Sequence, residues 1–208
     1  MRDGALSATP LPPVEHADAG SSSWLRVIVG DDASARPQGV RQPASGALQH
    51  LLEAGRFAVT AELSPPDSAD PDDLVRAAAP LRGVVDAVNV TDAAGACCHL
   101  SGLAASALLL QAGFDPILQL TCRDRNRIAL QADILGAAAL GIGNLLCLTG
   151  DGVAHGDHPG AKSVFDLDAV SLLETARTLA DSGRFLSGRP LTAAPRLFLG
   201  AADNPFAP

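Results

Sequence analysis

The sequence contains few aromatic and few basic residues. Of 208 residues, six are Phe, one is Trp and none is Tyr, so a core has to be packed mainly from Ala, Leu and Val. Fifteen Lys and Arg stand against 23 Asp and Glu, which gives a formal net charge of −8. This acidic balance argues against a nucleic-acid partner. The longest apolar runs are interrupted by Gly, Gln or Asn, which argues against a membrane-spanning segment.

Cysteine is also scarce. The four cysteines are Cys97, Cys98, Cys122 and Cys147, and no two of them form a C-x-x-C pair. Neither a disulfide framework nor a zinc site is indicated, so we predict no metal site. The N-terminus lacks the apolar core of a signal peptide. Together with the thiols, this favours a reducing, cytoplasmic location.

The chain divides into two segments of different composition. Residues 1–45 are rich in Ala, Ser, Pro, Asp and Gly without a sustained hydrophobic period, which is typical of a flexible N-terminal arm. Within this arm the apolar run at residues 24–29 could equally pack as an isolated strand. Residues 46–208 show a regular alternation of apolar runs and amphipathic stretches, which predicts a folded domain.

The expected elements of the second segment follow a fixed order. Strands are predicted at residues 57–63, 85–91, 116–121, 144–148 and 196–200. Helices are predicted at residues 47–54, 70–81, 99–111, 124–140 and 166–180. Asp70 followed by Pro71 is typical of a helix start, and Asp124 is the expected N-cap of the fourth helix.

The predicted strands are near-continuous apolar runs, as is typical of parallel strands covered on both faces. The first four begin roughly 30 residues apart, which is the length of a βα unit. These features predict an α/β fold of the (β/α)8 TIM-barrel type. We expect it to be incomplete, with about five βα units, because a whole barrel typically needs about 250 residues. An open doubly wound sheet is the alternative.

Polar residues appear where the apolar strands end. Glu62 lies at the end of the first strand, Thr121 at the end of the third, and Gly150 and Asp151 follow the fourth. In a parallel barrel the carboxyl ends of the strands carry the catalytic and binding residues. We therefore expect these strand ends to contribute to one site.

Five segments at the strand ends resemble the methylenetetrahydrofolate reductase family. They are Thr60–Pro66, Asp86–Asp92, Gln119–Cys122, Cys147–Asp151 and Gly200–Pro205. The resemblance runs from about residue 51 to residue 208. Members of this family are flavin-dependent (β/α)8 barrels, in which NADH or NADPH passes hydride to FAD, and the flavin passes it to 5,10-methylenetetrahydrofolate.

The resemblance implies roles for individual residues. Glu62 matches the acid that protonates the leaving nitrogen when the folate ring opens, and Asp151 matches the acidic residue beside the flavin and the pterin. These two are the predicted catalytic residues. A carboxylic acid keeps its proton near neutral pH only in apolar surroundings. The residues next to Glu62 in the sequence, Ala61 and Leu63, are apolar and compatible with such surroundings. The positions that match flavin-binding residues are Thr91, Asp92, Ala94, Gln119, Leu148, Thr149, Gly150, Asp151 and Asn204.

The loop after the fourth strand contains His155, Asp157 and His158. Three ligand-type residues crowded into one loop have poor metal geometry. We therefore expect this loop to act as a polar lid over the flavin.

Two residues depart from the commoner family pattern. Many members carry His where this sequence has Gln119, and Arg where it has Thr149, although both substitutions occur in a more divergent bacterial branch. Family members also continue through three further strands beyond the position of Pro208. The chain is therefore expected to be either a fragment or a truncated product.

The expected activity is the reduction of 5,10-methylenetetrahydrofolate to 5-methyltetrahydrofolate, with FAD as cofactor and NADH or NADPH as reductant. One alternative is a non-catalytic fragment, pseudoenzyme or binding module, whose barrel a second copy or a complementing chain would close. Another is a different folate- or pterin-binding barrel that needs no flavin.

Overall fold

The computed structural model describes residues 46–202. The predicted arm, the apolar run at residues 24–29 and the predicted cofactor-binding residue Asn204 lie outside this range. The strands are β1 (Thr60–Leu63), β2 (Ala87–Val90), β3 (Pro116–Thr121), β4 (Asn144–Leu148) and β5 (Phe198–Ala201). The α-helices are α1 (Ala47–Glu53), α2 (Pro71–Ala78), α3 (Gly102–Gln111), α4 (Arg127–Ala139) and α5 (Ala169–Ser182). Three short 3-10 helices are η2 (Ala79–Leu81), η3 (Ala94–Ala96) and η4 (Val153–His155).

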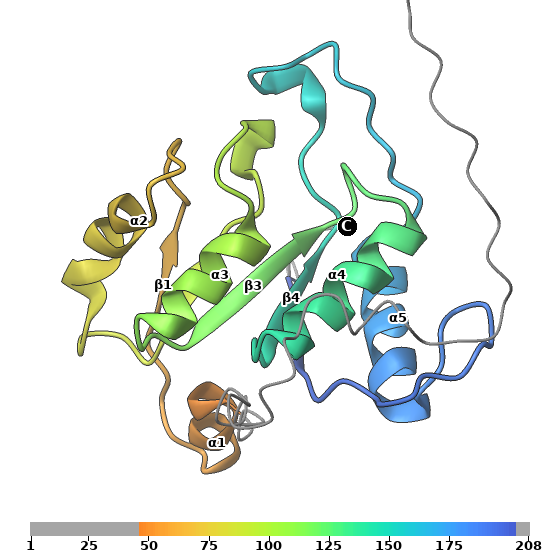
Figure 1. Cartoon of the computed structure of the whole chain (residues 1–208), viewed down its shortest axis with the longest axis horizontal. Helices are drawn as coiled ribbons and strands as arrows, with labels where there is room; N and C mark the ends of the chain where they lie inside the picture. The colour runs from red at the N-terminus through yellow and green to blue at the C-terminus, as the bar shows by residue number, and fades with distance from the viewer. Residues whose placement is uncertain (1–45, 203–208) are drawn as a thin grey trace, which may run out of the picture. The chain divides into compact units, whose positions relative to one another are not determined.

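The five strands form one parallel sheet in the order β1-β2-β3-β4-β5. A helix connects each strand to the next, and neighbouring helices contact one another in the same order, from α2 to α5. Figure 1 shows α3 and α4 on the viewer's side of the sheet, near β3 and β4. A doubly wound sheet reverses its strand order, whereas the strands of residues 46–202 follow one another in sequence order. The predicted α/β fold, with units of the TIM-barrel type, is therefore confirmed for residues 46–202.

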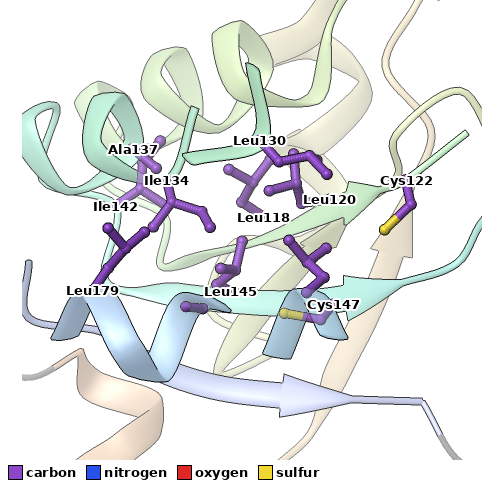
Figure 2. Close-up of a cluster of buried hydrophobic side chains, with 12 residues drawn as sticks. Leu118, Leu120, Cys122, Leu130, Ile134, Ala137, Ile142, Leu145, Cys147 and Leu179 are labelled. Atoms are coloured by element: carbon purple, nitrogen blue, oxygen red, sulfur yellow. The ribbon is translucent and has the colours of Figure 1, made fainter. Parts of the chain in front are cut away.

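The main core lies between the sheet and α4 and α5 (Figure 2). Leu118 and Leu120 of β3 and Leu145 of β4 pack against Leu130 and Ile134 of α4. Burying one such side chain contributes about 1.5–3 kcal/mol relative to leaving it exposed. Because side chains alternate along a strand, the residues between these leucines, such as Gln119, point to the opposite face of the sheet.

The helix starts follow local capping rules. The Asp70 side chain accepts a hydrogen bond from the Asp72 amide, and Pro71 occupies the first turn of α2, as predicted. The predicted N-cap of the fourth helix was wrong. Asn126, not Asp124, caps α4, because its side-chain oxygen accepts from the amides of the following turn. Among the residues that the structure describes, no helix is long and apolar enough to cross a bilayer.

Helix α1 lies at the end of the sheet where the strands begin (Figure 1). Asp115, just before β3, accepts a hydrogen bond from the Leu48 amide at 3.0 Å and another from the Asn144 side-chain amide at 2.8 Å. This carboxylate therefore ties α1 to the start of β4. The opposite, carboxyl end of the strands carries the loops with η3 and η4, and it holds the candidate site.

Candidate functional site

One cavity of about 340 Å³ lies at the carboxyl ends of β1 to β4. All nine predicted site residues that fall within the described range line it, although they come from four separate strand ends and the loops that follow them. Two further residues line it: Thr121, which was expected at this rim as a strand-end residue, and Arg123, which was not predicted. The full lining is Glu62, Thr91, Asp92, Ala94, Gln119, Thr121, Arg123, Leu148, Thr149, Gly150 and Asp151.

Glu62 and Gln119 meet over β2. The Gln119 side-chain amide donates a hydrogen bond of 3.1 Å to Oε2 of Glu62. Gln119 is buried, with 7% of its surface exposed, whereas Glu62 is exposed. The apolar enclosure expected for a general acid is therefore not provided by residues 46–202. What the structure provides is an orienting hydrogen-bond donor for the carboxylate.

Asp92 is bound on all sides by donors from the protein. Its carboxylate accepts from the backbone amide and the hydroxyl of Thr121, both at 2.9 Å. Both terminal nitrogens of Arg125 also donate to it, and Arg125 pairs in addition with Asp133 at 2.9 Å. Burial raises the pKa of Asp133, and the nearby Asp92 charge adds to that, while Arg125 opposes it. Asp92 thus joins the end of β2 to the end of β3.

Gly150 is required by both conformation and space. Its φ is +94°, in the region that L side chains rarely adopt. A Cβ atom there would lie 3.0 Å from Cβ of Thr121 and 3.2 Å from Cβ of Arg123. The neighbouring Thr149 accepts a hydrogen bond at its hydroxyl from the Ala169 amide, at 3.0 Å. The turn after β4 is therefore packed between the end of β3 and the start of α5.

Asp151 belongs to a contact between two loops. Its Oδ2 accepts a hydrogen bond of 3.0 Å from the amide of Gly95 in η3. Asp157, further along the same loop, accepts one of 3.0 Å from the Cys98 amide, and this bond lowers the pKa of Asp157. Between them Gly156 packs directly against the Ala96 backbone. The predicted lid is thus joined to the loop after β2.

The histidines of that loop do not gather a metal-ligand set. Across residues 46–202, no group of three or more His, Cys, Asp or Glu side chains is placed to hold a metal ion. Two buried cysteines, Cys122 directly after β3 and Cys147 in β4, are also unsuited to nucleophilic chemistry. Burial raises the pKa of Cys122 to about 11 and that of Cys147 to about 12, so both remain neutral thiols at neutral pH.

Arg123 is the site residue that sequence reasoning missed. It lies two residues after the end of the buried strand β3, yet charged residues are almost never fully buried unless they are paired. Only 2% of its surface is exposed, and it pairs with Asp124 through Nε and Nη2. The sequence signal that could have revealed it is its position, two residues after Thr121 at the same rim.

Comparison with known protein families agrees with this geometry. The family model described as Methylenetetrahydrofolate reductase matches residues 47–187. The matched span contains β1 to β4 and every residue that lines the cavity. A search of individual curated proteins gives no match.

Proposed function

Because the chain belongs to the methylenetetrahydrofolate reductase family, we propose that it reduces 5,10-methylenetetrahydrofolate to 5-methyltetrahydrofolate, with NADH or NADPH as reductant and FAD as cofactor. One observation carries the proposal. Nine residues predicted through the family resemblance line one cavity at the edge of the sheet where such barrels place their chemistry.

The cavity has properties that suit a flavin ring. Its volume of about 340 Å³ falls in the usual range of small-molecule sites. Leu148 and Ala94 provide apolar contact, and Gly150 keeps one wall free of a side chain. Arg123 adds a charged hydrogen-bond donor to the lining. A bound FAD would supply the two-electron hydride chemistry that amino-acid side chains lack.

The two acidic residues have distinct proposed roles. Glu62 would deliver a proton to the folate nitrogen that leaves when the ring opens, while Gln119 holds its carboxyl group in place. Because Glu62 is exposed in the described structure, the proposal requires that bound ligands cover it and exclude water from it. Asp151, held by the Gly95 amide, would stand beside the pterin and influence the flavin electrostatically.

The first experiment measures cofactor binding and turnover on the whole chain. Purified protein is titrated with FAD and then assayed with 5,10-methylenetetrahydrofolate and each nicotinamide in turn. We expect FAD binding, and a turnover at least 100-fold lower in Glu62→Gln, because general acids contribute about 10²–10⁴-fold. Glu174→Gln, an exposed carboxylate on α5, is the matched control and should retain full turnover. Absence of FAD uptake in the unaltered protein would overturn the proposal.

The exposure of Glu62 also favours a second candidate, a binding module without turnover. FAD or folate binding combined with no turnover under any condition would support that alternative. Within residues 46–202, β1 and β5 each have a strand neighbour on one side only, and unpaired strand edges promote association. We therefore propose that the chain associates with a second copy or with a complementing chain. A monomeric mass in solution would contradict self-association.

The four free thiols support a reducing location such as the cytoplasm.

A further inference from the structure

Arg123 carries an unused hydrogen-bond donor at the cavity. Its side chain is 3% exposed, and Nε and Nη2 both donate to Asp124, at 3.0 and 2.7 Å. Among residues 46–202, Nη1 has no hydrogen-bond partner. A buried guanidinium with an unmet donor is unfavourable unless a ligand or solvent supplies an acceptor. Nη1 is not among the buried polar atoms that lack a partner, so it is open to the cavity that Arg123 lines, and water or a bound ligand there can supply the acceptor.

The position of the guanidinium is set by its surroundings. The Arg123 carbonyl accepts from the Val164 amide at 2.7 Å, and its Cβ lies against Gly150. The pKa of Arg123 is raised, chiefly by its hydrogen bond with Asp124 and against the effect of burial. The group is therefore a fixed, charged donor rather than a mobile surface side chain.

The charges around Arg123 select the kind of acceptor. Three carboxylates, those of Glu62, Asp92 and Asp151, line the same cavity. Arg125 matches the charge of Asp92 and Asp124 matches that of Arg123, so the charges of Glu62 and Asp151 remain and keep the setting acidic. The diphosphate of a dinucleotide such as FAD would add two negative charges to this acidic setting. A carbonyl oxygen on a neutral planar ring accepts the same hydrogen bond without that repulsion.

We propose that Nη1 of Arg123 is a binding group for the ring carbonyl of a heteroaromatic ligand in the cavity, and not for a phosphate. The inference rests on the proposed function. Both ligands of the proposed reaction, the flavin and the folate pterin, carry a pyrimidine ring with such a carbonyl. The hydrogen bond is expected to fix the ring's orientation over Gly150.

The test distinguishes a contact between Arg123 and the ligand's ring from a contact between Arg123 and the phosphates of FAD. Binding of FAD, riboflavin and 5-methyltetrahydrofolate is measured by fluorescence titration for the unaltered chain, Arg123→Gln and Arg123→Lys. Riboflavin has the flavin ring without a phosphate. A charged hydrogen bond is worth about a 10- to 100-fold change in affinity, so Arg123→Gln should weaken FAD and riboflavin by the same factor. Arg123→Lys, which keeps the charge but loses the planar fork, should fall between.

The control is Arg177→Gln, because Arg177 also pairs with an aspartate but is exposed on α5. It should bind all three ligands normally. Thermal melting shows whether each Arg123 variant is folded, and Arg123→Lys decides the question if Arg123→Gln does not fold.

Each remaining outcome is decisive. If the Arg123 variants lose affinity only for 5-methyltetrahydrofolate, the inference is supported and the ring carbonyl that Arg123 binds is that of the pterin. A loss confined to FAD, with riboflavin unaffected, indicates a phosphate contact and overturns the inference. Normal binding of all ligands by the Arg123 variants also overturns it, while leaving the proposed function intact. If the unaltered chain binds none of the three, the proposed function fails and this inference fails with it.

Discussion

The Arg125 guanidinium holds the Asp92 carboxylate by two hydrogen bonds, from Nη1 to Oδ2 at 2.6 Å and from Nη2 to Oδ1 at 3.0 Å. Only 5% of Asp92 is exposed, and its carboxylate also accepts the Thr121 amide. The pair therefore links the loop after β2 to the loop after β3, directly below the cavity. This contact is a structural support for the site as well as part of its lining.

We predict that Asp92→Ala destabilises the chain by about 3 kcal/mol, because removing one partner of a buried pair leaves an uncompensated charge. Arg125→Met combined with Asp92→Ala should cost less than the sum of the two single changes. Urea unfolding of the four proteins measures both effects. As a control, Asp181→Ala breaks the exposed pair with Arg177 and should change stability by less than about 1 kcal/mol. An equal cost for the Asp92 and Asp181 variants would contradict this role.

The turn after β4 contains two glycines, Gly150 and Gly152, whose replacement by Ala should have different effects on stability. Gly150→Ala introduces a side chain at φ +94°, with Cβ only 3.0 Å from Cβ of Thr121, so we expect a loss of about 2 kcal/mol or more. Gly152 has φ −68°, and no atom lies within 4 Å of its Cβ position. Gly152→Ala should therefore be neutral or slightly stabilising. Chemical denaturation of the two variants provides the comparison, and equal midpoints would disprove the packing argument.

The loop contact at Gly156 leads to a third prediction. In Gly156→Ala the added Cβ would overlap the Ala96 carbonyl, so the two loops must separate. We expect cleavage of residues 150–165 by a protease to become about tenfold faster, equivalent to about 1.4 kcal/mol of local stability. Gly160→Ala, where no atom lies within 4 Å of the Cβ position, should be cleaved at the normal rate. Identical digestion of both variants would count against a joined lid.

The buried thiols predict selective reactivity. At pH 8 we expect a thiol reagent to modify Cys98 rapidly, because Cys98 is exposed. Cys122 and Cys147 are buried, and their raised pKa values of about 11 and 12 leave almost no thiolate. Both should react only after unfolding in urea. Peptide mapping of the modified sites checks the assignment, and rapid labelling of Cys147 in the folded protein would refute it.

The same thiols predict a loss of stability in alkali. Burial raises the pKa of Cys122 and Cys147 from 9.0 to about 11 and about 12, so the folded state holds protons that the unfolded state releases. Their contribution to stability is complete below about pH 9 and is lost as pH rises through those folded values. The sequence has no Tyr and a single Lys, so few other side chains titrate there. Unfolding free energies at pH 8 and about pH 10.5 measure the effect, and no decrease would contradict it.

How well the sequence predicted the strands depended on their burial. The bounds of β3 and β4 agree with the predicted residues 116–121 and 144–148, because both are apolar runs paired on two sides. The first strand was predicted from Phe57, but β1 begins at Thr60, where pairing with β2 starts. Phe57 is 89% exposed. Residue type indicates a tendency to extend, whereas a partner strand decides where a strand begins.

The candidate site, too, was predicted from the sequence only in part. The sequence predicted which residues stand at the strand ends, and the structure places nine of them around one cavity, although their roles stay predictions. It misassigned Asp124 as a helix cap. Asp124 and Asn126 are both good capping residues, and only the burial of Arg123 shows that Asp124 is needed as its counter-ion.

The sequence by itself determined the order of the elements, the parallel character of the strands and the polar residues that follow them, because these depend on local hydrophobic pattern and turn chemistry. The tertiary structure alone decided which side chains meet. Asp92 and Arg125 are 33 residues apart, and Asp151 and Gly95 are 56 apart. Ladder hydrogen bonds between neighbouring strands bring such residues together. The role of a carboxylate, as ligand contact, counter-ion or support for a loop, depends on which groups lie near it in space. The local sequence pattern does not encode those neighbours.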